Sequence, residues 1–513
     1  MSSFPWLTTI GAVPLVGAAA VLAAPKTREQ AAKVVALGAS LLTLLLTILA
    51  CVKFDIGGDR FQLVESHRWI PAFGVRYALG VDGIALSLIA LSAVLVPIVI
   101  LASWWDAEDG KRSVRTFFAL LLVLETMMIG VFAATDVFLF YVFFEAMLVP
   151  MYFLIGSYGG TQRSYAAVKF LLYSLFGGLL MLAAVIGLYV VSNQQLPGSV
   201  GTFDFQTLVG LNITPGVEKA LFLGFFIAFA IKAPLWPFHT WLPDAAAEAP
   251  TGAAVLLVGV LDKVGTFGMI RYCLPLFPDA SDYFAPLVIT LSIIGIFYGA
   301  LLAMGQTDLK RLVSYTSVAH FGFIALGVFA FTTQGQAGAT LYMVNHGFST
   351  GALFLLVGFL IHRRKSRQVG DFGGVQQVAP WLAGAFMIAG LSSLALPGLN
   401  SFVSEFLVLV GTFTRYRTAA IIATVGIVLA ALYILLVIQR TMHGPLRAGL
   451  EETPDLSSRE AWVIAPVLAI IVVLGVYPKP LLDVITPAVK QTMQDTGRTD
   501  PVPTAPVAQE GGK

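Results

Sequence analysis

Long apolar segments restrict what this chain can fold into more than any other feature of its sequence. A helix that spans a bilayer needs about 20 mostly apolar residues. No long alternation of apolar and polar residues is present, which argues against a β-barrel. The sequence therefore predicts an all-α polytopic membrane protein with fourteen transmembrane helices, near residues 4–24, 34–53, 79–103, 115–134, 136–157, 166–192, 217–238, 252–273, 283–304, 310–331, 337–361, 380–412, 418–439 and 460–478.

The composition supports a membrane location. Only 12% of the 513 residues are charged, against about 25% in soluble domains. The net charge of +2 argues against a nucleic-acid-binding surface. Two cysteines, Cys51 and Cys273, imply neither a disulfide framework nor a metal cluster. The N-terminal segment lacks the basic region that precedes a signal peptide's apolar core, so we expect a retained first helix.

Loop charge predicts the orientation and the domain plan. Lys and Arg are concentrated in the loops after the odd-numbered helices, which the positive-inside rule places in the cytoplasm, with both termini on the periplasmic side. The Pro-, Thr- and Gln-rich end is predicted to be disordered. The expected units are helices 1–3 in 1–114, helices 4–8 in 115–274, helices 9–13 in 275–442, helix 14 in 443–487 and a disordered tail in 488–513.

Acidic, basic and imidazole side chains lie within several of these apolar windows. A charged side chain at the centre of a spanning helix costs roughly 3 kcal/mol on insertion scales, and Ser or Asn could hold helices together at lower cost. Acids, imidazoles and amines all exchange protons. The set therefore suggests a proton pathway through Glu125, Glu145, Lys232, Asp262, Lys263, His320, His346 and Glu405.

Each of these residues also has a structural interpretation. Glu145 could be a neutral acid that is hydrogen-bonded to a neighbouring helix. Lys232 could extend its amine to the interface, although the following PLWPF segment is still apolar. Lys263 lies near the centre of its window, too far from either interface to do so easily.

The remaining residues also have both a structural and a functional interpretation. Asp262 precedes Lys263 by one position, which turns its side chain about 100° around the helix, so a structural role fits it as well as a functional one. His320 and His346 could be packing residues. For Glu125 a structural and a functional role fit equally well. Glu405 follows a broken helix with no base nearby in the sequence.

Two of the predicted helices contain breakers. Pro234 and Pro237 interrupt AIKAPLWPFHTWLPD, and Pro397 with Gly398 interrupts SSLALPGLNSFVSEF. Proline removes a backbone donor, and broken backbone at membrane depth is tolerated where it lines a cavity or is packed in protein. Paired interrupted helices are typical of internal repeats with sites near the midplane. Helices 4–8 and 9–13 are therefore predicted to be inverted repeats.

A buried Glu145–Lys232 pair could drive proton transfer. An ion pair at about 4 Å in an effective dielectric of about 20 is worth roughly 4 kcal/mol. Moving one charge against 100 mV costs about 2.3 kcal/mol. Closing the pair would therefore hold a proton on the amine, and opening it would send the proton onward. No GxGxxG, Walker or metal-binding motif is present, so any electrons travel elsewhere.

Several segments resemble the antiporter-like subunits of proton-pumping NADH:quinone oxidoreductase, respiratory complex I. The resemblance covers essentially all fourteen helices. The Glu in the twelfth helix, at position 405, and the short region after helix fourteen are similar to the branch called subunit M, or chain 13. The segments are FFEAMLVPMYFLIG, IKAPLWPFHTWLPDAAAEAPTGAAVLLVGVLDKVGTFG, TDLKRLVSYTSVAHFGF and LPGLNSFVSEF.

The resemblance implies a proton-translocating role in a bacterial inner membrane. Glu145 and Lys232 would form the tunable pair, and the proton relay would continue through Lys263, His320, His346 and Glu405. Two departures from the family pattern leave the route of proton entry unassigned. Ala246 stands where many relatives have His, and Asp262 stands where an apolar residue is common.

The resemblance also implies partners and excludes cofactors from this chain. FMN and iron–sulfur clusters are expected in partner subunits, and two further antiporter-like subunits are expected to flank this one among other complex I membrane subunits. The alternatives are a subunit of a multisubunit cation/proton antiporter or of a membrane-bound hydrogenase. A self-contained solute transporter is less compatible, since no span offers a pocket for an organic substrate. Composition alone does not distinguish protons from sodium.

Overall fold

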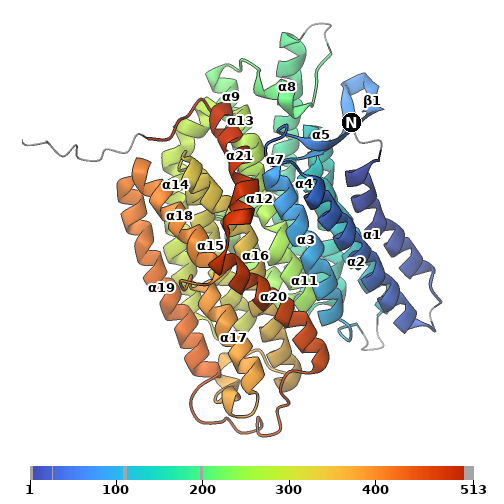
Figure 1. Ribbon diagram of the computed structural model, residues 1–513, viewed down its shortest axis with the longest axis vertical. Helices are drawn as coiled ribbons and strands as arrows, with labels where there is room; N and C mark the ends of the chain where they lie inside the picture. Colours follow the sequence, from blue (N-terminus) through green and yellow to red (C-terminus); the bar gives the residue numbers. More distant parts are fainter. Residues whose placement is uncertain (1–3, 26, 108–111, 197–199, 502–513) are drawn as a thin grey trace, which may run out of the picture.

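The structure, a computed structural model, describes residues 4–25, 27–107, 112–196 and 200–501. Most of its helices run along the long axis of one bundle (Figure 1). The elements in chain order are α1 (Trp6–Ala23), α2 (Glu29–Lys53), β1 (Gln62–Ile70), η1 (Pro71–Phe73), β2 (Val75–Val81), α3 (Gly83–Ala102), α4 (Val114–Ala133), α5 (Val137–Ala146), α6 (Leu148–Tyr158), α7 (Arg163–Gln195), α8 (Phe205–Val209), α9 (Pro215–Lys232), η2 (Phe238–Thr240), α10 (Trp241–Glu248), α11 (Thr251–Leu256), η3 (Leu257–Leu261), α12 (Lys263–Gly268), η4 (Met269–Cys273), α13 (Leu274–Leu276), α14 (Pro278–Gly305), α15 (Leu309–Val328), α16 (Thr333–Arg364), η5 (Val369–Asp371), η6 (Val375–Gln377), α17 (Pro380–Ser393), α18 (Asn400–Arg415), α19 (Arg417–Thr441), α20 (Ser458–Val476) and α21 (Lys479–Asp495).

Among the described residues, twelve helices are long and apolar enough to cross a membrane, or thirteen if the turns at Val369–Gln377 are joined to α17 across a bend of 115°. This supports the predicted membrane class. The windows predicted at 217–238 and 380–412 are not continuous helices. The first ends in a break after α9, with α10 beyond it, and the second is divided into α17 and α18. The difference from the predicted fourteen lies at these two breaks.

The first break ends α9 at Lys232. The amides of Ala233 and Leu235 donate to carbonyls within α9, at 2.8 and 2.9 Å, and the chain then turns through η2 into α10. The Trp241 indole N–H returns to the carbonyl of Ile231 at 2.8 Å. The break thus places Lys232 in the last turn of a helix, where backbone carbonyls favour a positive charge.

The second break separates α17 from α18 and is held by α16. Gly398 has φ +94°, a conformation that suits glycine. The Asn345 side-chain amide donates to the Asn400 carbonyl at 2.7 Å, and the Asn400 amide donates to the Asn345 carbonyl at 3.1 Å. Broken backbone is thereby hydrogen-bonded inside the protein, as membrane depth requires.

The prediction of an all-α chain is wrong in one segment, which forms a two-stranded antiparallel hairpin of β1 and β2. β2 is largely buried because it pairs with the turn before α5: Thr135 N–H donates to the Ala78 carbonyl at 3.0 Å, and Arg76 N–H donates to Asp136 Oδ2 at 3.0 Å. The hairpin lies at the same end of the bundle as α8 (Figure 1).

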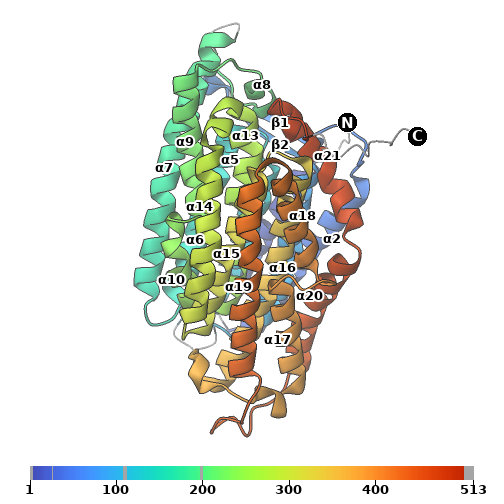
Figure 2. The same ribbon diagram turned by 90° about the vertical axis from the view of Figure 1, so that its left-hand side faces the viewer.

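The prediction of a disordered tail from residue 488 is also wrong where the structure describes it, and residues 502–513 lie outside the described residues. α21 continues to Asp495 because Ile485, Ala488, Val489 and Thr492 form one buried stripe. An Arg60–Asp495 ion pair at 2.7 Å fastens its end. α21 lies at the same end of the bundle as the start of the chain (Figure 2).

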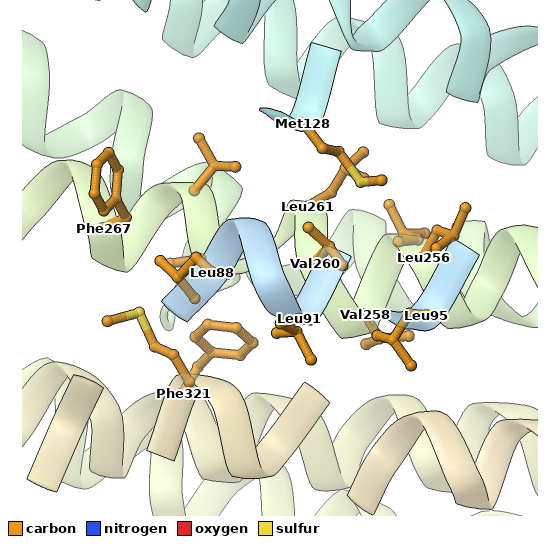
Figure 3. Packing of buried hydrophobic residues seen from close by; sticks show 14 of the residues in the cluster. Leu88, Leu91, Leu95, Met128, Leu256, Val258, Val260, Leu261, Phe267 and Phe321 are labelled. Carbon is orange, nitrogen blue, oxygen red and sulfur yellow. The ribbon is translucent and has the colours of Figure 1, made fainter. Parts of the chain in front are cut away.

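The centre of the bundle is apolar and closely packed. Leu88, Leu91 and Leu95 of α3 and Phe321 of α15 surround the fully buried η3 turn (Figure 3). The segment Thr251–Leu276, which contains η3, is completely buried over its most apolar window. Any charged group on this segment therefore lies in an environment of low polarity.

Candidate functional site

The six predicted relay residues lie on six different helices, and five of them are buried. Glu145 lies at the end of α5 and is half-buried. The other five, which are 0–3% exposed, are Lys232 on α9, Lys263 on α12, His320 on α15, His346 on α16 and Glu405 on α18. Residues that are up to 260 positions apart in the sequence are thus assembled in the interior.

Glu145 and Lys232 lie close enough for each to act electrostatically on the other. Glu145 Oε1 and Lys232 Nζ are both buried without a hydrogen-bond partner among the described residues. The Lys232 amine lies 4.7 Å from the centroid of the Phe144 ring and 5.9 Å from that of Phe170. The pair is therefore separated, and aromatic faces partly compensate the ammonium.

Gly178 on α7 makes room for the Glu145 carboxylate. A Cβ atom added at this glycine would overlap Glu145 Oε1. The absence of a side chain at Gly178 is thus a condition for the position of the acid.

Lys263 and His346 are in direct contact. Lys263 Nζ lies 2.7 Å from His346 Nδ1, and His346 Nε2 lies 3.0 Å from Ser317 Oγ. The lysine amine also donates to the carbonyl of Val258 in the π-helical turn η3. The contact can pass a proton in either direction, because either nitrogen can act as the donor while the other is the acceptor.

The series continues through a second histidine. The His346 and His320 rings are 5.2 Å apart, edge to face. His320 Nε2 lies 3.2 Å from the Tyr433 hydroxyl, and the Tyr342 hydroxyl donates to Glu405 Oε2 at 3.2 Å. The His320 and Tyr342 rings are themselves 5.8 Å apart. Tyr342 therefore lies between His320 and Glu405, and Tyr433 contacts His320.

Sequence reasoning missed Ser317, Tyr342 and Tyr433. Ser317 lies three residues before His320, and Tyr342 lies four before His346, so both share a helix face with a buried histidine. That spacing could have identified these two. Tyr433 has no comparable signal, because it reaches His320 from α19, 113 residues away.

Asp262 and Glu125 are both fully buried, and none of their carboxylate oxygens has a hydrogen-bond partner within the described part of the chain. They differ in their surroundings. Asp262 is acted on by the charges of both Lys263 and Lys232. Glu125 on α4 has no described charged group acting on it.

A polar cavity of about 510 Å³ opens near the start of α11, the helix that leads to Lys263. The Lys310 amine donates to the Ala249 carbonyl at 2.8 Å, and Arg367 pairs with Glu248 at 2.9 Å. Its titratable lining residues are Asp106, Glu248, Lys310, His362, Lys365 and Arg367. The cavity brings water-accessible ionisable groups to one end of the central helix.

Two family models match the chain. Residues 134–430 match "NADH:quinone oxidoreductase/Mrp antiporter, TM", and residues 36–131 match "NADH-ubiquinone oxidoreductase chain 4, amino terminus". The first match contains every residue of the buried series except Tyr433. The fold and the site therefore belong to the region that defines this family.

Named relatives and solved structures agree with these matches. NADH-quinone oxidoreductase subunit M of Mycobacterium tuberculosis is 53% identical over 98% of this chain and 96% of that protein. Subunit M of Rhodobacter capsulatus is 41% identical over 95% and 96%. A chain in the structure of respiratory complex I from Thermus thermophilus with bound NADH superposes with a TM-score of 0.87 at 31% identity, covering 96% of this chain and 100% of that chain.

A chain of the Mrp complex from Dietzia sp. DQ12-45-1b shares the fold, with a TM-score of 0.84 at 20% identity over 97% of this chain and 100% of that chain. At this identity the likeness concerns the fold alone. The family is shown by the family models and the close relatives. The chain belongs to the NADH:quinone oxidoreductase/Mrp antiporter family of membrane subunits.

Proposed function

We propose that this chain is the subunit-M-type membrane subunit of an NADH:quinone oxidoreductase and that it translocates protons. The observation that carries the proposal is the set of titratable side chains from Glu145 to Glu405 in the interior, within which Lys263 contacts His346. Each costs free energy to place in an apolar interior. The relatives named NADH-quinone oxidoreductase subunit M, over nearly the whole chain, support the assignment.

The separated Glu145–Lys232 pair is the switch. When the side chains approach, the carboxylate stabilises the ammonium and the amine keeps its proton. When they separate, the ammonium loses that stabilisation in a low-polarity interior and releases the proton. An ion pair worth roughly 4 kcal/mol exceeds the roughly 2.3 kcal/mol needed to move one charge against 100 mV.

The proton then moves along the buried series. Lys263 passes it to His346 through their 2.7 Å contact. It then passes to His320, whose ring lies 5.2 Å from that of His346, and on to Glu405 through Tyr342, whose hydroxyl donates to that acid. The polar cavity beside Lys310 supplies protons to the central helix from the end that carries the basic loops.

The topology follows from the same proposal. The broken segments α9–α10 and α17–α18 each cross the bilayer, which makes fourteen spans. Residues 115–274 and 275–442 form two inverted repeats of helices 4–8 and 9–13, after 1–114 and before helix 14 in 443–487. The basic loops face the cytoplasm, and both termini lie on the periplasmic side of a bacterial inner membrane.

The redox chemistry belongs to partner subunits. FMN and iron–sulfur clusters reside there, and their quinone reduction drives the switch in this chain. Two further antiporter-like subunits flank it and share the horizontal polar series. Enrichment of iron–sulfur and flavin subunits with this chain would support this assembly, whereas co-purification with only antiporter subunits would contradict it.

The function is tested by Glu145→Gln and Lys232→Ala in membrane vesicles. NADH-driven proton uptake and quinone reduction are measured together, so that protons per electron pair are obtained. Both variants should assemble and lose pumping. Glu29→Gln, an exposed acid in the first turn of α2, is the control and should pump normally. Normal pumping by either Glu145→Gln or Lys232→Ala would rule out the proposed function.

A further inference from the structure

Asp262 is a buried carboxylate that the series described above does not use. It follows the π-helical turn η3, is 0% exposed, and has both oxygens buried without a hydrogen-bond partner among the described residues. Buried polar groups with a purely structural role are normally hydrogen-bonded. A carboxylate left without partners in an apolar interior therefore calls for another explanation.

The packing of α12 shows which way this carboxylate faces. Gly265 lies three residues after Asp262 and so on the same side of the helix. A Cβ atom at Gly265 would overlap the carbonyl of Phe229 and the amide of Ala233, both at the end of α9. Because Lys232 lies between those two residues, the side of α12 that carries Asp262 faces the end of the helix that carries Lys232.

Lys263 faces a different neighbour. Its side chain is turned about 100° from that of Asp262, and it contacts His346 on α16. The adjacent residues thus reach toward two different helices, one toward α9 and the other toward α16. The dipeptide lies between the Glu145–Lys232 pair and the histidines.

The charges agree with this placement. Asp262 is acted on by Lys263 and Lys232, and the charged groups that act on Lys232 are Glu145 and Asp262. Lys232 therefore has one carboxylate on the side of the switch and a second on the side of Lys263. Within the described residues no ion pair of 4 Å or less joins Asp262 to either lysine, so neither lysine holds the carboxylate.

We propose that Asp262 carries the proton from Lys232 to Lys263. The Lys232 ammonium transfers a proton to the Asp262 carboxylate, which leaves a neutral amine and a neutral carboxylic acid. The acid then transfers that proton to the Lys263 amine and returns to the carboxylate. This step rests on the proposed function, and it closes the gap between the switch and the histidine half of the series.

The test compares Asp262→Asn with Lys232→Ala in vesicles that contain the whole complex. Asn has nearly the same shape as Asp but cannot take up the proton, so the complex should assemble while pumping falls by about 10²-fold or more, the usual effect of losing a positioned proton-transfer group. Asp262→Leu gives a second, apolar replacement with the same expected loss. Glu218→Gln on α9 is the matched control, because Gln can still accept from the amides of Asp279 and Ala280.

A second readout separates proton transfer from a structural effect. If Asp262 carries the proton, Asp262→Asn should raise the solvent deuterium isotope effect on quinone reduction, and Asp262→Glu should restore part of the pumping. The double variant with Lys232→Ala should lose no more than Lys232→Ala alone.

The outcomes are distinguishable. Loss of pumping in Lys232→Ala together with normal pumping in Asp262→Asn would overturn this inference and leave the proposed function intact. Normal pumping in Lys232→Ala would overturn both. An assembled Asp262→Asn complex that pumps poorly with an unchanged isotope effect would also overturn the role of Asp262 as a carrier.

Discussion

Lys263 Nζ lies 2.7 Å from His346 Nδ1, although 83 residues separate the two in the sequence. This contact joins α12 to α16 at the centre of the bundle, and Ser317 contacts the other ring nitrogen. It is the one direct link between a lysine and an imidazole that the structure describes in the buried series. We expect the series to fail when either partner loses its ability to exchange a proton.

Replacing Lys263 with Gln should abolish pumping with normal assembly. Gln keeps a polar side chain of similar length but cannot take up the proton that Lys263 passes to His346. Loss of such a group typically slows proton transfer by about 10²-fold or more. Protons per electron pair in vesicles are the measurement, and His443→Gln in the loop after α19 is the control. Near-normal pumping by Lys263→Gln would contradict a relay through this contact.

Replacing Gly178 with Ala should disturb the switch without touching a titratable group. The new Cβ atom would overlap Glu145 Oε1 and displace the carboxylate. We expect lower pumping from a complex that still assembles. Gly384→Ala is the matched control, because a Cβ at that helical glycine meets nothing within 4 Å. Equal pumping by the two variants would show that the position of Glu145 does not matter.

Replacing Tyr342 with Phe should slow proton transfer to Glu405, the last residue of the buried series. The substitution removes one hydroxyl, which donates to Glu405 Oε2. A hydrogen bond to a charged group is worth about 1.5–3 kcal/mol, so pumping should fall by about tenfold or more. Tyr433→Phe should have a separate effect through His320. Turnover and pumping unchanged in both variants would exclude the tyrosines from the path.

Replacing Arg363 with Ala should destabilise the subunit rather than its proton path. Arg363 donates to both carboxylate oxygens of Glu460, at 2.8 and 2.7 Å, and fastens α16 to α20. Removing one member of a buried ion pair typically costs about 3–5 kcal/mol. We expect less assembled complex and a lower midpoint of thermal unfolding. Lys479→Ala, which removes the exposed Lys479–Asp483 pair, should change the midpoint little.

The stability of the contact between the hairpin and the start of α5 should depend on pH. Burial raises the pKa of the Asp136 carboxyl to about 6, and its hydrogen bonds to backbone amides oppose that rise only in part. The folded protein therefore holds this proton more tightly than the unfolded chain. The resulting stability is complete below about pH 4 and is lost as the pH rises through about 6, by up to about 3 kcal/mol.

The measurement is the free energy of unfolding of the wild type and Asp136→Asn between pH 4 and pH 7. Asn does not titrate, so the wild type should lose stability relative to this variant as the pH rises. Asp204→Asn, at the isolated bridge opposite Asp136, is the neighbouring control. A constant difference between wild type and Asp136→Asn across this range would contradict the prediction.

Much of the helical plan could be predicted because it depends on local patterns. Runs of apolar residues identified the helices, and Pro234 and Pro397 with Gly398 located both breaks, since proline removes a backbone donor and crowds the preceding turn. Proline alone does not decide a break, because α3 and α14 continue through Pro97 and Pro286. The charges in the apolar windows likewise identified the titratable residues of the site. The stripe Ile485, Ala488, Val489 and Thr492 carried the same kind of signal for α21, but the polar composition around it obscured that helix.

Other features depend on which segments meet. The sequence by itself determined that this chain is a helical membrane protein with acids and bases inside its spans, because hydropathy and helix breakers act over one or two turns. Only the tertiary structure decided that Lys263 contacts His346, that Tyr433 reaches His320 and that Asp262 faces α9. Helical periodicity shows which face of a helix is buried, whereas the identity of the partner is set by packing between residues that are far apart in the chain.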